Sequence, residues 1–212
     1  FGTGDFTVEG WIYLTDLVGT QQVFDFRSSV FSDIAPTVYV SNGGQLRYYT
    51  DSADRIIGST LNSATWYHIA LSRASGSTKL FVNGTQVGST YTDSNDYGLS
   101  KPLTIGSRYD GGNEFGGHFD DFRVSNNARY SSNFAAPGAA FTSDSNTVLL
   151  LQFNGTDGST VIVDDGITTQ DIRTTSGGTA SKIDFANYSD FGVEVRSIGS
   201  ANVYGNYGIY GD

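Results

Sequence analysis

The 212-residue sequence contains no cysteine and no methionine, and it has only three prolines and two histidines. The lack of cysteine excludes disulfides and thiol chemistry, so the fold needs no oxidising compartment. No run approaches the roughly 18 apolar residues of a membrane-spanning helix, so we expect no membrane insertion. Basic residues are scarce as well, and the formal net charge is −10. Nucleic-acid binding needs clustered Lys and Arg, so we expect no nucleic-acid partner.

Aromatic residues are abundant, at 14% of the sequence, and 27 glycines accompany them. Residues 6–14 alternate as a strand does and place Phe6, Val8, Ile12 and Leu14 on one face. Further strands are expected over residues 23–27, 37–40, 45–49, 101–107, 115–125 and 148–153. Only residues 126–133 suggest a helical turn. Many short strands at this spacing predict an all-β sandwich.

The middle of the chain carries the clearest local signal. Residues 66–73, W-Y-H-I-A-L-S-R, alternate over eight positions, which fits a strand and no helix. Asn83-Gly84 interrupts the following apolar run, L-F-V-N-G-T-Q-V, at residues 80–87. This dipeptide suits a two-residue type I′ hairpin, in which both central residues need a positive φ.

Four motifs occur in order: the 66–87 segment, F-G-G-H-F-D-D-F-R-V at 115–124, N-A-R-Y with N-F and P within 127–137, and L-L-L-Q-F-N-G at 149–155. Together they resemble the laminin-G-like branch of the concanavalin A-like lectin/glucanase superfamily. The resemblance implies an antiparallel jelly-roll β-sandwich over residues 1–166, with its N-terminal strand missing before Phe1. The predicted core residues are Trp11, Trp66, Phe81, Phe119, Phe122, Leu149 and Leu151.

Residues 167–212 have a different composition and are predicted to form a short β-rich, Gly- and Tyr-rich extension. A short strand is expected at 193–196, and Tyr204, Tyr207 and Tyr210 repeat at every third position. So little apolar mass cannot form a core of its own. We therefore expect this assembly or linker segment to pair with the sandwich edge or with a neighbouring copy. A symmetric homo-oligomer is the default for such an assembly, and fibre proteins would suggest a trimer.

Hydrolysis is disfavoured by the distribution of acidic residues. The chain has three glutamates, Glu9, Glu114 and Glu194, far apart and without the E-x-D-x-x-E pattern of glucanases in this superfamily. Asp120 and Asp121 are adjacent on an expected strand, so regular geometry would point them to opposite faces. We therefore expect no enzymatic activity and assign no catalytic residue.

The two histidines do not indicate a metal site. The resemblance implies a packing and hydrogen-bonding role for His68, and His118 has no second ligand nearby in sequence.

One loop offers the best binding residues. Tyr109, Asp110 and Asn113 are candidates for a carbohydrate site, because sugars stack on aromatic rings and pair with carboxylates and amides. Asp110, Asn113 and Glu114 are candidates for calcium, the ion that the resemblance implies. An ordinary polar turn is the alternative.

The pattern A-R-Y…F…P followed by L-L-L-Q-F-N-G-T-D-G-S-T, at 128–160, resembles structural and tail-fibre proteins of marine bacteriophages. The segment V-R-S-I-G-S-A-N-V-Y-G-N-Y-G at 195–208 resembles segments of cyanophage virion proteins. This implies a non-enzymatic virion protein, either a tail fibre or a surface decoration, that carries a lectin-like module. Its partners would be other virion subunits or copies of itself, and a host cell-surface glycan. The alternative is a carbohydrate-binding module of an extracellular or cell-surface bacterial adhesin.

Overall fold

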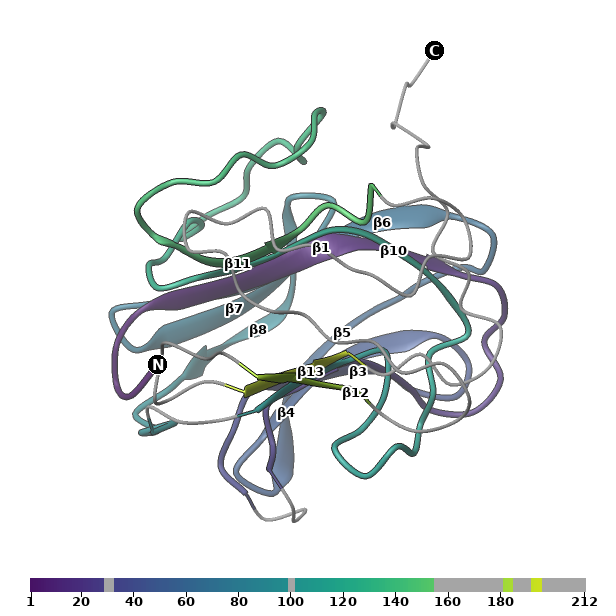
Figure 1. Ribbon diagram of the computed structural model, residues 1–212, viewed down its shortest axis with the longest axis horizontal. Coiled ribbons are helices and arrows are strands. Elements are labelled where there is room, and N and C mark those ends of the chain that lie inside the picture. The colour runs from purple at the N-terminus through teal and green to yellow at the C-terminus, as the bar shows by residue number, and fades with distance from the viewer. Residues whose placement is uncertain (29–32, 99–101, 155–180, 185–191, 196–212) are drawn as a thin grey trace.

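The chain folds into two β-sheets that lie face to face, as the computed structural model shows (Figure 1). The structure describes residues 1–28, 33–98, 102–154, 181–184 and 192–195. Within these ranges no helix is long and apolar enough to cross a membrane. Each sheet is apolar on its inner side, so stacking the two buries both inner faces and gives the predicted all-β sandwich.

Sheet A has six antiparallel strands in the spatial order β11-β10-β1-β6-β7-β8. They are β1 (Phe6–Leu14), β6 (Trp66–Ala74), β7 (Ser77–Val82), β8 (Thr85–Thr92), β10 (Gly117–Ser125) and β11 (Thr147–Leu151). β1 lies in the middle of the sheet, where Thr7 faces Ser72 of β6 on one side and Ser125 of β10 on the other.

Sheet B has the order β12-β13-β9-β2-β3-β4-β5, and only β13 beside β9 is parallel. Its strands are β2 (Gln21–Asp25), β3 (Thr37–Val40), β4 (Gln45–Thr50), β5 (Ala53–Thr60), β9 (Leu103–Ile105), β12 (Ser181–Asp184) and β13 (Gly192–Val195). β12 and β13 belong to the predicted extension and lie at the edge of this sheet. The predicted boundary after residue 166 and the contacts of Tyr204, Tyr207 and Tyr210 fall outside the described residues.

The predicted hairpin at Asn83-Gly84 is confirmed, with φ angles of 48° and 76° between β7 and β8. Gly84 is also needed for a second reason. The N–H of Phe134 donates to its carbonyl at 2.9 Å, and a Cβ on Gly84 would collide with the Phe134 backbone. One glycine therefore permits both the turn and the approach of a distant segment.

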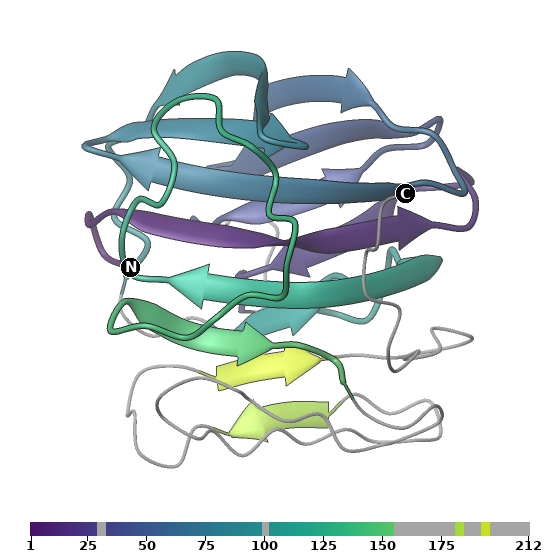
Figure 2. The same ribbon diagram turned by 90° about the horizontal axis from the view of Figure 1, so that it is seen from above.

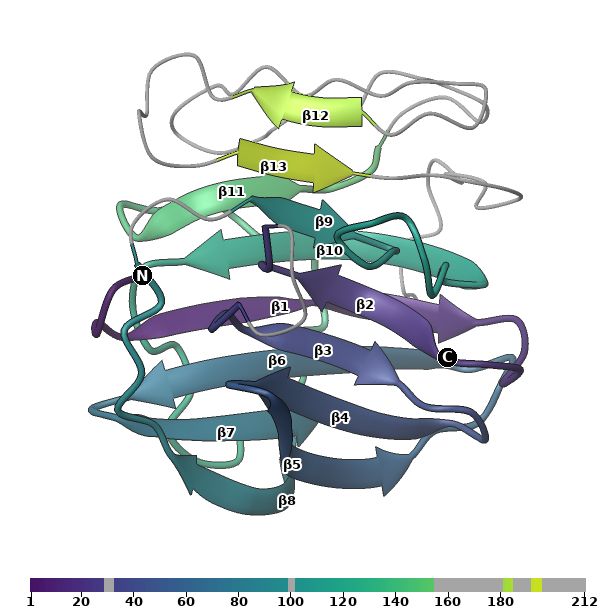
Figure 3. The ribbon, with the colours of Figure 1, turned by 90° about the horizontal axis from the view of Figure 1, so that it is seen from below.

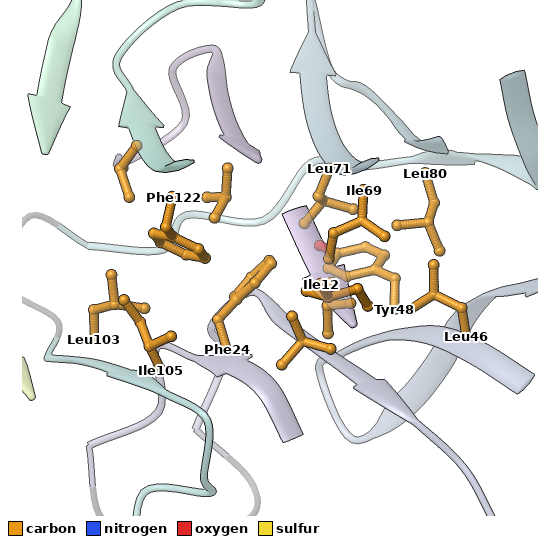
Figure 4. Close-up of a cluster of buried hydrophobic side chains, with 14 of the residues drawn as sticks. Ile12, Phe24, Leu46, Tyr48, Ile69, Leu71, Leu80, Leu103, Ile105 and Phe122 are labelled. Atoms are coloured by element: carbon orange, nitrogen blue, oxygen red, sulfur yellow. The ribbon is translucent and has the colours of Figure 1, made fainter. Parts of the chain in front are cut away.

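The core lies between the sheets and is built from the inward-facing residue of each alternating pair. Figure 4 shows side chains from both sheets meeting there, among them Phe24, Tyr48 and Phe122, each no more than 1% exposed. The β1 alternation predicted from the sequence is confirmed, because Phe6, Val8, Ile12 and Leu14 all belong to this core.

The predicted core list is correct only in part. Phe122, Leu149 and Leu151 lie in the central core. Trp11 and Phe81 are buried, but outside this cluster, and Phe81 packs 5.3 Å from Phe134 between ring centres. Trp66 and Phe119 are only half-buried, and Phe119 packs against the edge of the core. Outward-facing strand positions are therefore buried as well, which requires a further layer.

That layer is residues 126–146, here called the strap, which joins β10 to β11 and crosses the outer face of sheet A (Figure 2). The predicted helical turn at 126–133 is wrong, because these residues form bends without a helix. Their hydrogen bonds go to the sheet instead: Thr7 Oγ1 donates to the Asn127 carbonyl and accepts from the Arg129 N–H, both at 2.9 Å. Tyr130 and Phe134 stack with ring centres 3.5 Å apart.

Candidate functional site

The loop between β9 and β10 holds the predicted sugar and calcium ligands, and a salt bridge already occupies its carboxylate. Arg108 Nε and Nη2 donate to the two oxygens of Asp110 at 2.7 and 2.6 Å, and the Gly112 N–H donates to Oδ1 at 3.1 Å. The hydrogen bonds from Arg108 lower the pKa of Asp110 to about 2. A calcium ion would therefore have to displace a guanidinium from this carboxylate.

The other predicted residues of this loop are held in different ways. Tyr109 is half-buried, and its N–H donates to Asp25 Oδ2 at 3.2 Å. Asn113 has a φ of 52°, and its carbonyl accepts from the Gln22 N–H at 2.7 Å. Glu114 is exposed. Among the described residues, no three His, Cys, Asp or Glu side chains gather closely enough to hold a metal ion.

Tyr109 connects this loop to the outer face of sheet B through a buried ion pair. Arg27 donates to both oxygens of Asp25, at 2.8 Å from Nε and 2.7 Å from Nη2. The Arg27 guanidinium carbon lies 5.2 Å from the ring centre of Tyr109 and 5.3 Å from that of Tyr49. Because a guanidinium is attracted to aromatic faces, both rings are held against the same cation.

Strands β3, β4 and β5 lie side by side in sheet B (Figure 3). They carry a second polar group on this face. Tyr39 donates its hydroxyl to Asp54 Oδ1 at 2.7 Å. Arg47 donates to Asp54 Oδ2 at 2.6 Å and to Gln45 Oε1 at 2.8 Å. Burial and the hydrogen bond to Asp54 raise the pKa of Tyr39 to about 12, so its phenol stays protonated. The side chains of Arg47 and Asp54 remain 28% and 21% exposed, so this fixed group faces solvent.

Sequence reasoning missed this group because β5 was not recognised. The signal was present in residues 45–49, where Leu46 and Tyr48 point into the core and Gln45, Arg47 and Tyr49 alternate outward. The alternation does not reveal the partner of Arg47, because Asp54 lies on β5, a strand with no clear apolar pattern.

The outer face of sheet A carries a different arrangement, centred on buried Glu9 beneath the strap. Glu9 Oε1 accepts from Arg123 Nε at 2.9 Å and Nη2 at 2.7 Å. Its Oε2 accepts from the Tyr130 hydroxyl at 2.8 Å and lies 3.2 Å from His68 Nε2. Burial alone would raise the pKa of Glu9, but the hydrogen bonds from His68 and Arg123 outweigh it and lower the pKa. Glu9 and His68 are fully buried, so both have structural roles.

Asp121 departs from the regular geometry on which the opposite-face prediction rested. Its φ is 47°, and the register between β1 and β10 shifts beside it, as at a β-bulge. Its N–H donates to Asp120 Oδ1 at 3.0 Å. Burial and the neighbouring charge of Asp120 raise the pKa of Asp121 to about 6, against a hydrogen bond from the Phe141 backbone. Sequence alternation cannot reveal such a bulge.

The comparison with protein families gives the class of the chain. Residues 1–135, more than half of the sequence, match the model of the concanavalin A-like lectin/glucanase superfamily. The chain therefore belongs to this superfamily, and the resemblance seen in its motifs is confirmed at that level. A comparison with curated protein sequences found no match.

Three solved structures that are similar to this chain share little sequence with it. A candidate carbohydrate-binding protein from Bacteroides ovatus superimposes with a TM-score of 0.61 at 17% identity, covering 77% of this chain and 50% of its own. The CBM40 module of Ruminococcus gnavus IT-sialidase, bound to α2,3-sialyllactose, gives 0.49 at 16% identity, covering 61% and 80%. A pentraxin from Limulus polyphemus gives 0.45 at 17% identity, covering 61% and 67%. This chain spans half the length of the Bacteroides protein, and its superposition on that protein establishes the shared fold.

Proposed function

We propose that the chain is a non-enzymatic carbohydrate-binding module that uses the outer face of sheet B and the adjoining ring of Tyr109. The observation that carries this is the solvent-facing group of Tyr39, Arg47 and Asp54, in which mutual hydrogen bonds fix each polar side chain. Sugars are recognised by such planar groups, which pair with hydroxyls, and by aromatic rings, which cover the C–H face of the sugar. Membership of the superfamily and the fold shared with the Bacteroides protein support this proposal.

The contacts of the carboxylates favour sugar binding over sugar hydrolysis. Glycosidases need two carboxyl groups that flank the substrate, about 5–5.5 Å apart in retaining enzymes. Asp25 and Asp54, on the proposed face, are each tied to an arginine. Glu9 is buried on the other side of the sandwich with its oxygens already bonded. Asp25 and Asp54 therefore hold the proposed face in place. None of the three carboxylates is placed to exchange protons with a substrate at that face.

The test is a glycan array probed with the full chain and two matched variants. Tyr39→Phe removes one hydroxyl from the proposed face, and we expect about a tenfold loss of signal, as for the loss of one hydrogen bond in a binding site. Tyr67→Phe is the control, because Tyr67 lies on β6 of sheet A, packs against the core and accepts a hydrogen bond from the Asn62 N–H at its hydroxyl. Glycan binding that both variants retain equally would refute the assignment of this face.

For the biological setting we propose a virion component of a bacteriophage, either a tail fibre or a surface decoration, with copies of itself and a host glycan as partners. The likeness of the 128–160 and 195–208 segments to phage structural proteins supports it. Sedimentation and electron microscopy of the full chain test this setting. A regular homo-oligomer is expected, whereas a strictly monomeric glycan binder would favour the alternative, a module of a cell-surface adhesin.

A further inference from the structure

On the side of the molecule opposite to the proposed site, sheet A carries three partly exposed rings from neighbouring strands. We call Tyr13 of β1, Trp66 of β6 and His118 of β10 the aromatic cluster. Tyr13 pairs in register with Trp66 on one side and His118 on the other. The ring centres lie 5.5 Å apart for Tyr13–Trp66, 5.4 Å for Tyr13–His118 and 6.5 Å for Trp66–His118. All three side chains are half-buried.

The position of the strap explains why these rings remain partly exposed. Its hydrogen bonds to β1 are at Thr7 and Glu9, and the Phe134 ring reaches His68 of β6, which pairs with Trp11. Figure 2 shows the strap crossing the half of the sheet in which β1 begins. Trp11, which lies one outward position before Tyr13, is 8% exposed. The aromatic cluster lies one step further along β1, past the strap.

The charge beside the aromatic cluster is negative. Asp120 lies two residues after His118 on β10, so strand alternation places it on the same outer face. Asp121 follows at the bulge, and its buried Oδ1 has no hydrogen-bond partner within the described part of the chain. The arginines of this face do not offset these acids. Arg123 is bound to Glu9, and Arg129 to Asp144 at 2.8 Å.

We infer that the aromatic cluster and Asp120 form a second carbohydrate-binding site, selective for neutral saccharides. Rings about this far apart present a surface of the size of one pyranose, whose C–H face stacks on aromatic carbon. The Asp120 carboxylate accepts hydrogen bonds from sugar hydroxyls, which are donors. The same carboxylate, with Asp121 behind it, repels the negative charge of uronates and sialic acids. The site is separate from the sheet B face, so the two assignments can fail independently.

The experiment measures binding of four probes to the full chain at pH 8. Two are neutral, the hexamers of glucose and of N-acetylglucosamine, and two are acidic, a guluronate hexamer and sialyllactose. Tryptophan emission gives a direct readout, because Trp11 is buried and Trp66 is the partly exposed one of the two tryptophans. We expect a neutral hexamer to change the emission of the unmodified chain. Because Trp66→Ala removes this reporter, the variants are compared by isothermal titration calorimetry, and we expect Trp66→Ala to weaken neutral binding about tenfold, as for the loss of one aromatic stacking contact.

Two further variants keep the test valid if Trp66→Ala does not fold. His118→Ser removes another ring of the cluster, and Asp120→Asn removes the charge but keeps an acceptor. We expect His118→Ser to weaken neutral binding severalfold, and Asp120→Asn to bring acidic probes up to at least half the neutral signal. Thermal melts identify variants that remain folded.

Tyr39→Phe distinguishes this inference from the proposed function, since it alters only sheet B. Loss of neutral binding in Trp66→Ala or His118→Ser, but not in Tyr39→Phe, supports the second site. Binding that only Tyr39→Phe weakens overturns the second site and leaves the proposed function intact. Binding of acidic probes alone, or of none of the four, also overturns the second site.

Discussion

The outer faces of the two sheets show how one layer of chain changes the role of similar side chains. Each face carries a carboxylate that binds an arginine and a tyrosine: Glu9 on sheet A and Asp54 on sheet B. Under the strap the Glu9 side chain is fully buried, whereas Asp54 is 21% exposed. The buried group holds the fold together and the exposed group can meet a ligand. Coverage by the strap, more than residue type, decides which of these two groups is open to solvent.

The largest expected difference between the faces is in stability. Glu9→Ala leaves the Arg123 guanidinium buried without its carboxylate, and removing one partner of a buried ion pair costs about 3–5 kcal/mol. Asp54→Ala breaks a pair in contact with water, where the cost is about 1 kcal/mol or less. Denaturant unfolding of both variants measures the two free energies. Equal losses would mean that the strap does not isolate Glu9 from solvent.

Asp121, beside the outer face of sheet A, allows a second comparison, in which the free energy of unfolding is measured at several pH values. Because its pKa is raised to about 6, the folded state binds this proton more tightly than the unfolded chain. Its contribution is therefore most favourable below about pH 4 and is lost as the pH rises through about 6. Asp121→Asn should stabilise the protein at pH 8 by about 1–2 kcal/mol after screening by water, and hardly at all at pH 4. Asparagine also tolerates the positive φ.

Asp110→Asn is the matched control, with the opposite sign. The pKa of Asp110 is lowered to about 2 by Arg108, so its contribution is present above about pH 4 and is lost as the pH falls toward 2. Its side chain is 41% exposed, so the loss at pH 8 should stay below about 1 kcal/mol. Melting curves of both variants across this pH range give the signs. A stabilising Asp110→Asn, or a neutral Asp121→Asn, would contradict the assigned charges.

The smallest effect is expected from calcium. Arg108 occupies both oxygens of Asp110, so millimolar calcium should raise the melting temperature by no more than about 1 °C through binding to the folded state. Differential scanning calorimetry with calcium and with chelator measures the shift. A larger increase that Asp110→Ala abolishes would show that the ion displaces Arg108 and would establish the calcium site.

The sequence predicts what depends on neighbouring residues and misses what depends on distant ones. The β1 alternation and the Asn83-Gly84 hairpin follow from strand period and turn chemistry, and both were predictable. The sequence of the strap suggests a helical turn at 126–133, but the hydrogen bonds that fix these residues run to Thr7 and Glu9 of β1, across most of the chain. The Asp121 bulge likewise depends on pairing with β1 and leaves no local signature.

The candidate site shows the same division. Tyr109 and Asp110 were found because a polar loop with an aromatic residue is visible in the sequence. The Tyr39, Arg47 and Asp54 group was not, since it comes together only when β3, β4 and β5 pair. The aromatic cluster is assembled in the same way, from three strands.

The central position of β1 has a consequence for synthesis. Both neighbours of the first strand, β6 and β10, are translated after it, and Arg123, the partner of Glu9, comes later than most of the sandwich. In an emerging chain, both edges of β1 therefore stay unpaired until β6 leaves the ribosome. The second edge stays unpaired until β10 follows. Such non-local pairing is typical of domains that fold on the order of milliseconds to seconds. Until β10 has been made, the unpaired edge of β1 could pair with the same strand of another nascent chain on the same messenger RNA.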